Sequence, residues 1–147
     1  MDKFDSEFCG LFLGEGCATI QKINKKGYKR PLYRPQFKMS MRADDRKLLE
    51  AIQSRYGGYL YDHLPHRNSK PGVEWRLTNR DDILNLCNIL LDSELPAKKI
   101  QDIAILKEFV ELRPRNSWHV SDEIREKLEE LFQKIRLVKQ YDFNVPG

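Results

Sequence analysis

The sequence has few of the residues that form metal clusters or disulfide frameworks. Its 147 residues include three cysteines and three histidines. Cys9, Cys17 and Cys87 form no CxxC pair and the histidines form no HExxH motif, so a zinc site and a disulfide framework are both poorly supported. We therefore expect the cysteines to be reduced, as is usual inside cells.

Long apolar segments are also absent. The first residues are acidic and lack the apolar core of a signal peptide, and no stretch approaches the roughly 20 apolar residues of a membrane span. We expect a soluble, intracellular protein of the cytoplasm or an organelle, without a membrane partner. With 40% hydrophobic residues, the chain can bury one core but hardly two, so residues 1–147 are expected to form a single domain.

Positive charge is concentrated in the N-terminal half. The formal net charge is only +4, but residues 1–80 carry 16 basic and 9 acidic side chains, whereas residues 81–147 carry 10 and 13. Residues 22–42 alone hold eight basic residues and no acid. Such blocks are often plain solvated surface, but a face that meets phosphates needs one, so we interpret this block as a nucleic-acid-binding surface.

Periodicity and turn residues predict an alternation of helices and strands. Asp5 or Ser6 caps a first helix that runs to the Gly14-Glu15-Gly16 break. A second helix opens at Asp44 and ends at Gly57-Gly58, where a left-handed conformation is expected. Strands are predicted at residues 17–23, 33–42, 59–64 and 73–78, loops at 24–31 and 65–72, and helices from Asn79 or Asp81, from Pro96, and over 122–138.

The second predicted strand alternates between polar and apolar residues. Its polar positions are Gln36, Lys38, Ser40 and Arg42, and its apolar positions are Phe37, Met39 and Met41. This period of two is typical of a sheet with one wet face. The element order predicts an α+β domain in which helices cover the other face of one sheet.

The last predicted helix, over residues 122–138, is amphipathic. Its apolar stripe should pack on the core, and its exposed side is acidic, which should keep it away from nucleic acid. The stripe consists of Ile124, Leu128, Leu131 and Ile135, and the acids are Glu126, Glu129 and Glu130.

Gly10 and Gly14 distinguish the first helix. They lie four residues apart and so share one face, on which a second backbone can approach closely. The chain has one such helix, so its partner would come from a second copy across a two-fold axis. Glycines at this spacing also suit an ordinary helix-to-strand turn, but the strand and basic sheet that follow favour the dimer.

The segment Phe8-Cys9-Gly10-Leu11-Phe12-Leu13-Gly14-Glu15-Gly16 resembles the LAGLIDADG motif of homing endonucleases. With the ββαββα order after it, the resemblance covers about residues 5–112. Several positions depart from the motif. Phe8 and Cys9 replace Leu and Ala, Leu13 replaces the first acid, and Glu15 replaces the second acid, which is the metal ligand in that family.

The resemblance implies one subunit of a homodimeric, site-specific DNA endonuclease. Its fold would be an αββαββα core, with a curved antiparallel sheet as a saddle on double-stranded DNA, followed by C-terminal helices. Its gene would lie in an intron or an intein, and the sequence leaves a free-standing gene open as well. The interface would contain Phe8, Gly10, Leu11 and Gly14.

Glu15 is the residue on which the expected chemistry depends. The resemblance places it, beside Gly14, at a metal on the dimer axis. Two carboxylates at helix C-termini repel each other there unless a divalent cation neutralises both. Oxygen ligands suit Mg²⁺, for which Mn²⁺ or Ca²⁺ can substitute in binding.

The resemblance also implies which side chains contact DNA. Polar residues on the wet face would read bases, and the basic loop would meet phosphates. For the tyrosines, ordinary cross-strand stacking is an equal alternative. The predicted contacts are Thr19, Gln21, Lys25, Lys26, Lys29, Arg30, Arg34, Gln36, Lys38, Ser40, Arg42, Tyr59, Tyr61, His63, Glu74 and Arg76.

Lys98 is the second predicted catalytic residue. It precedes Gln101 and an apolar helix in the place where the family carries an active-site lysine, which would balance charge in the transition state. A solvated lysine at a helix start is an equally good reading, and Lys99 is adjacent. The residues that order active-site water in the family would fall near Met41 and Asp45, and Arg42 and Arg46 are the candidate substitutes.

Three other functions are alternatives for this sequence. An RNA maturase would take its intron RNA as a partner, and the sequence leaves this open. A non-cleaving DNA-binding regulator is disfavoured because Glu15 keeps a carboxylate. A histidine-metal nuclease is disfavoured because His63, His66 and His119 lack ligand spacing and are better interpreted as exposed loop residues.

Overall fold

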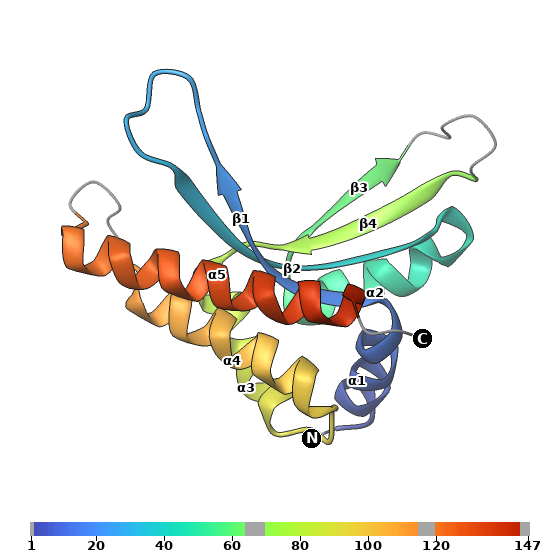
Figure 1. The fold of residues 1–147 in the computed structure, drawn as a ribbon. Helices are drawn as coiled ribbons and strands as arrows, with labels where there is room; N and C mark the ends of the chain where they lie inside the picture. Colours follow the sequence, from blue (N-terminus) through green and yellow to red (C-terminus); the bar gives the residue numbers. More distant parts are fainter. Residues whose placement is uncertain (1, 64–69, 115–119, 145–147) are drawn as a thin grey trace.

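The computed structural model describes residues 2–63, 70–114 and 120–144, with side chains described up to residue 137. Four strands form one curved sheet, and the helices lie on its convex side (Figure 1). The elements are α1 (Lys3–Glu15), β1 (Gly16–Ile23), β2 (Leu32–Arg42), a 3₁₀ turn (Ala43–Asp45), α2 (Arg46–Tyr56), β3 (Tyr59–His63), β4 (Gly72–Leu77), α3 (Arg80–Leu91), α4 (Ala97–Leu112) and α5 (Asp122–Asn144). The predicted α+β order is confirmed.

The sheet has the strand order β1-β2-β4-β3, and each neighbouring pair is antiparallel. Because successive residues of a strand point to opposite faces, the register decides which side chains share the concave face. Phe37 pairs with Leu77 and Met39 with Trp75, and all four are buried against the helices. The alternation predicted for β2 is therefore confirmed.

Helix α1 begins earlier than the sequence suggested. Asp2, not Asp5 or Ser6, is the N-cap, and its carboxylate accepts a 2.8 Å hydrogen bond from the Asp5 backbone N–H. The Asp5 carboxylate instead turns inward and accepts a 2.6 Å hydrogen bond from the Tyr56 hydroxyl. Burial and this bond to Asp5 raise the pKa of Tyr56, which keeps it a donor. The role of Asp5 thus depends on Tyr56 of α2, a partner that the sequence around Asp5 does not reveal.

Helix α2 ends where the glycine pair predicted. Gly57 and Gly58 have φ angles of +93° and +101°, which side chains rarely adopt. The carbonyl of Gly57 accepts a 2.8 Å hydrogen bond from the Trp75 indole, which ties this turn to β4. Helix α2 itself starts at Arg46, because Ala43–Asp45 form a 3₁₀ turn where the sequence suggested a helix opening at Asp44.

The C-terminal helices cover the convex face of the sheet. Asn79, one of the two predicted starts, caps α3 by accepting a 3.1 Å hydrogen bond from the Asp82 N–H, and Pro96 precedes α4 as predicted. Helix α5 extends to Asn144, beyond the predicted end at residue 138. The predicted stripe of α5 is buried at Leu128, Leu131 and Ile135, whereas Ile124 is half-buried.

One core lies between the sheet and the helices. Its largest fully buried side chains include Trp75, Phe12, Phe37 and Phe109. None of the described helices is both long and apolar enough to cross a bilayer. The predicted positions of His66 and His119, and most of the loop predicted at 65–72, lie outside the described residues.

Candidate active site and nucleic-acid interface

One face of α1 is not covered by the rest of the subunit. A Cβ atom built on Gly10 or on Gly14 meets no atom within 4 Å, and the Leu13 side chain between them is 46% exposed. Leu11 is half-buried at the edge of this face. Phe8, which the sequence placed with them, is only 3% exposed and packs on the rings of Tyr56 and Trp75 inside the subunit. The open face of α1 is therefore formed by Gly10, Leu13 and Gly14.

Gly16 has a different role from the other two glycines of the motif. A Cβ atom here would lie 2.0 Å from the ring of Phe12. Because Phe12 is fully buried against Phe37, its ring cannot give way freely. Gly16 thus lets the chain turn from α1 into β1 directly over the aromatic core.

Glu15 is the last residue of α1 and is exposed. It borders a depression of about 380 Å³ at the end of β2, together with Ser40, Met41, Arg42, Asp45, Lys70, Pro71 and Gly72. Within the described residues, no three His, Cys, Asp or Glu side chains form a cluster that could hold a metal ion. The depression thus holds one helix-terminal carboxylate, that of Glu15, beside basic groups from β2 and from the segment before β4.

Two positions that the sequence left unassigned lie near Glu15. Met41 and Asp45 both line the depression, as does Arg42, which makes a 3.4 Å ion pair with Asp44. Arg46 is instead paired with Glu50 and with Asp62 on β3. Of the two candidate arginines, Arg42 is the one that borders the depression.

The lysine that reaches the end of α1 is Lys99. Its Nζ donates a 2.7 Å hydrogen bond to the Gly16 carbonyl and lies 5.3 Å from the centroid of the Phe12 ring. Lys98, which the sequence favoured, is exposed in the first turn of α4. Sequence spacing could not separate the two, because which of them turns toward α1 depends on how α4 packs.

The concave face carries the strand residues that were predicted to contact DNA, in cross-strand rows. Thr19 lies opposite Gln36, and Gln21 opposite Arg34. The next rows are Cys17-Lys38-Arg76-Tyr59, Ser40-Glu74-Tyr61 and Arg42-Gly72-His63. Tyr59 and Tyr61 are 62% and 44% exposed, so cross-strand packing does not bury their rings.

Glu74 is a buried acid in the middle of this basic face. It is 6% exposed and accepts hydrogen bonds from Arg76 and, at 3.2 Å, from the Ser40 hydroxyl. His63 lies 3.9 Å away on β3. The guanidinium of Arg76 also lies 4.8 Å from the centroid of the Tyr61 ring. Glu74 therefore fixes the orientation of Arg76 and is itself covered by its neighbours.

Gln36 is also covered, with 5% exposure, and its Oε1 atom has no hydrogen-bond partner among the described residues. An unpaired buried polar atom is costly and is often explained by an absent partner. Gln36 lines a depression of about 520 Å³ on the saddle, with Thr19, Gln21, Lys38 and Arg76 among its other lining residues.

Arg136 of α5 also lines this depression, and the sequence gave no indication of it. The acidic surface of α5 had predicted that the helix lies away from nucleic acid. Its buried stripe does pack on the core, but α5 also contacts β1, the edge strand of the sheet. This packing brings one basic residue of α5 to the border of the saddle.

The basic block of residues 22–42 is divided between two sides of the sheet. Lys22 pairs with Glu129 of α5 at 3.1 Å, and Arg30 pairs with Asp122 at 2.7 Å, so both are turned toward the helices. Arg34 and Lys38 belong to the concave rows. Lys26 is exposed in the loop.

Glu129 anchors α5 to the hairpin. Burial opposes ionisation of its carboxylate, but hydrogen bonds from Tyr33, Gln133 and Lys22 outweigh that effect and lower the pKa of Glu129. Burial, together with the bond to Glu129, raises the pKa of Tyr33. The pair is therefore an ionised carboxylate and a neutral hydroxyl donor.

Comparisons with known proteins agree with this geometry. Residues 8–110 match the family model described as LAGLIDADG endonuclease. The chain belongs to the LAGLIDADG endonuclease family. A comparison of the sequence with curated proteins finds no match.

Solved structures of homing endonucleases and of a meganuclease share the fold. I-CvuI, in complex with the I-CreI target and magnesium with the DNA not cleaved, superposes with a TM-score of 0.76 at 14% identity, over 92% of this chain and 81% of that chain. I-TnaI superposes with a TM-score of 0.74 at 19% identity, over 95% of this chain and 96% of that chain. I-SmaMI bound to uncleavable DNA gives 0.73 at 18% identity, over 89% of this chain but only 44% of that chain. At these identities the likeness establishes the fold.

Proposed function

We propose that this LAGLIDADG protein is a homodimeric, metal-dependent endonuclease that cuts both strands of a specific DNA site. The observation that carries the proposal is the position of Glu15, an exposed carboxylate at the end of a helix whose glycine face is open. A second α1 packed on that face would bring two Glu15 carboxylates together at the two-fold axis.

The open face of α1 supports self-association. Gly10 and Gly14 would allow the two helix backbones to approach, and burial of Leu13 on both sides would add apolar area. Leu11 would close the edge of the contact. Phe8 has no part in this interface, because it already fills the core of its own subunit.

The residues at the end of α1 fit a divalent cation. Glu15, beside Gly14, offers oxygen ligands, the donor type that suits Mg²⁺, with Mn²⁺ or Ca²⁺ able to substitute in binding. The adjoining depression of about 380 Å³ leaves room for water and a phosphate. A bound cation would stabilise the leaving oxygen and lower the pKa of the attacking water. I-CvuI was crystallised with magnesium and with calcium.

The two lysines at the start of α4 would act differently. Lys99 is already bonded to the Gly16 carbonyl, so it would hold the junction that orients Glu15. Lys98 is exposed in the same turn and would be the catalytic cation that approaches a phosphate. Lys98→Gln should then lower kcat with DNA binding retained, whereas Lys99→Gln should also lower the thermal stability of the protein.

The concave face would read the DNA. Arg76, oriented by Glu74, presents its guanidinium beside Tyr61 and suits a guanine edge. Gln36 would obtain the partner that its Oε1 lacks from the amino group of a base, since an amide can both donate and accept. Arg34, Lys38 and Arg42 add positive charge along the same face.

Glu15→Gln tests the proposal. The amide keeps the size of the side chain but is a poor ligand for Mg²⁺, so cleavage should fall by at least about a thousandfold while binding in Ca²⁺ persists. Strand scission in Mg²⁺ and gel shift in Ca²⁺ would be measured on one substrate. Glu7→Gln is the matched control, since Glu7 is an exposed acid of α1 two turns away.

The two assays separate the alternatives. Retained cleavage by Glu15→Gln contradicts the catalytic role of Glu15. A wild-type protein that binds the site in Ca²⁺ but never cuts in Mg²⁺ contradicts the enzyme and favours a non-cleaving regulator.

A further inference from the structure

A second basic site lies on the helix side of the β1–β2 hairpin, away from the concave face. It is a pocket of about 470 Å³, formed by the hairpin, the end of α4 and the start of α5. Tyr33 lies at the boundary with the core. The centroid of its ring is 5.8 Å from that of Phe109 on α4 and 5.7 Å from that of Phe132 on α5. The volume lies within the range of about 300–1,000 Å³ typical of small-molecule sites.

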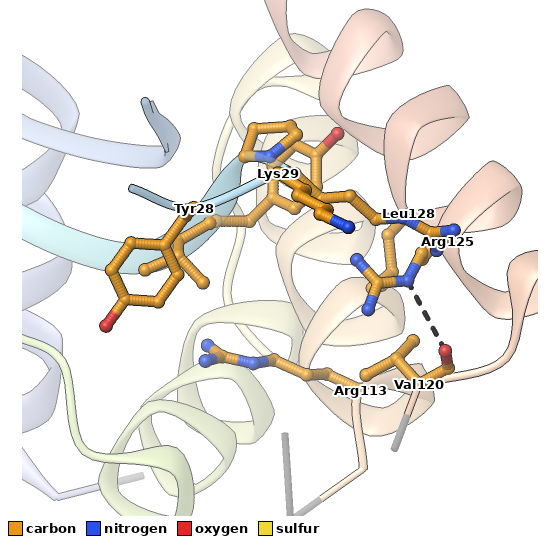
Figure 2. Close-up of a pocket in the computed structure, with 10 residues that line it drawn as sticks. Tyr28, Lys29, Arg113, Val120, Arg125 and Leu128 are labelled. Atoms are coloured by element: carbon orange, nitrogen blue, oxygen red, sulfur yellow. Dashed lines mark hydrogen bonds between the residues drawn. The ribbon is translucent and has the colours of Figure 1, made fainter. Parts of the chain in front are cut away.

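Four cations line this pocket: Lys29, Arg30, Arg113 and Arg125. Arg30 is neutralised by Asp122. In the parts of the chain described, no ion pair is found for Lys29, Arg113 or Arg125, and Arg125 uses its Nε only for a 3.3 Å hydrogen bond to the Val120 carbonyl. Figure 2 shows the guanidinium groups of Arg113 and Arg125 directed into the same space, with Tyr28 at its side.

Arg113 is a half-buried cation of this pocket. Burial and the nearby charge of Arg80 both lower its pKa, which means that its charged form is disfavoured where it stands. An arginine nevertheless stays protonated, so this half-buried guanidinium would gain from a bound anion. Arg80 donates to the Val110 and Arg113 carbonyls at the end of α4, so its positive charge is held near Arg113 and does not offset it.

The rest of the wall is apolar or aromatic. Pro31, Leu32, Val120 and Leu128 line it, and the ring of Tyr28 is 59% exposed. Lys25 approaches that ring at 6.0 Å from its centroid and adds a further cation at the rim. An aromatic ring such as that of Tyr28 can stack on a base, and guanidinium groups such as those of Arg113 and Arg125 can bind its phosphate.

We propose that this pocket binds a nucleotide, with its phosphate held by Arg113, Arg125 and Lys29 and its base against Tyr28. The site is separate from the saddle, so it would be occupied whether or not duplex DNA is bound. The nucleotide can be free or can be an unpaired residue of a single strand, since the recognised chemistry is the same.

Calorimetric titration of the full chain with adenosine 5′-monophosphate tests the proposal, with adenosine and inorganic phosphate as comparison ligands. We expect saturable binding of one nucleotide per chain, weaker binding of phosphate and no binding of adenosine. Arg113→Gln and Arg125→Gln should each weaken nucleotide binding by about tenfold or more, because each removes a charge-assisted hydrogen bond. If Arg113→Gln unfolds the end of α4, Lys29→Gln in the exposed loop tests the same site.

Lys47→Gln is the matched control, because Lys47 is an exposed cation on α2, far from the pocket in sequence and fold. Equal weakening by Lys47→Gln, equal binding of phosphate and nucleotide, or no saturable binding would each overturn the proposal. A short single-stranded oligoribonucleotide that displaces the nucleotide identifies a strand as the ligand source, and failure to displace it identifies a free nucleotide. In both cases duplex DNA should not compete.

Discussion

Gly14→Leu separates the stability of the subunit from the stability of the proposed dimer. In one subunit, the new side chain would point into open space, because a Cβ atom on Gly14 meets nothing within 4 Å. Glycine is a poor residue for a helix interior, so leucine should stabilise the isolated subunit by roughly 0.5–1 kcal/mol. If α1 has no partner in solution, Gly14→Leu should therefore be harmless or stabilising.

In the dimer the same substitution enters the interface twice. Overpacking costs about 1–3 kcal/mol per site, so two symmetry-related leucines should weaken association by about 2–6 kcal/mol, or roughly 30-fold to 10⁴-fold in Kd. Sedimentation velocity over a concentration series measures this, and thermal unfolding of the dilute protein measures the subunit. Ala104→Leu, on the exposed side of α4, is the matched control and should leave Kd unchanged.

An unchanged Kd for Gly14→Leu would refute the packing argument. So would a wild-type protein that sediments as a monomer at every concentration, with and without DNA. Loss of thermal stability in the dilute variant would show that α1 is already covered within the subunit.

The other predictions concern the core, the loop and the α5 anchor. Gly16→Ala should destabilise the protein by about 1–3 kcal/mol, seen as a lower Tm, because its methyl group would overlap the ring of Phe12. Lys26→Ala should lower DNA affinity and reduce the slope of log Kd against log salt by about one, without altering sequence preference, and a changed preference would mean that this lysine reads a base. Since the folded pKa of Glu129 is lowered, its contribution to stability is present above its usual pKa of 4.5 and is lost as the pH falls through the folded value. The wild type should therefore exceed Glu129→Gln in free energy of unfolding, measured with urea, by an amount that decreases as the pH falls. A difference that stays constant from pH 7 to pH 3 would contradict this.

Local patterns determined the element order and the facing of the strands. The alternation in β2, the glycine pair after α2 and Asn79 before α3 each depend on neighbours within a few residues, so the sequence predicted them correctly. The motif likewise placed Glu15 at the junction of α1 and β1, because helix, glycine turn and strand are adjacent in the chain.

Long-range packing decided what those patterns could not. Asp5 is a buried partner of Tyr56 and not a cap, because α2 packs on α1 51 residues later in the sequence. Phe8 lies in the core, Lys99 and not Lys98 reaches the Gly16 carbonyl, and α5 brings Arg136 to the edge of the saddle. Helical periodicity fixes which residues share a face, but not what that face meets. That depends on the angle and register at which helices distant in sequence pack, which only the tertiary structure determines.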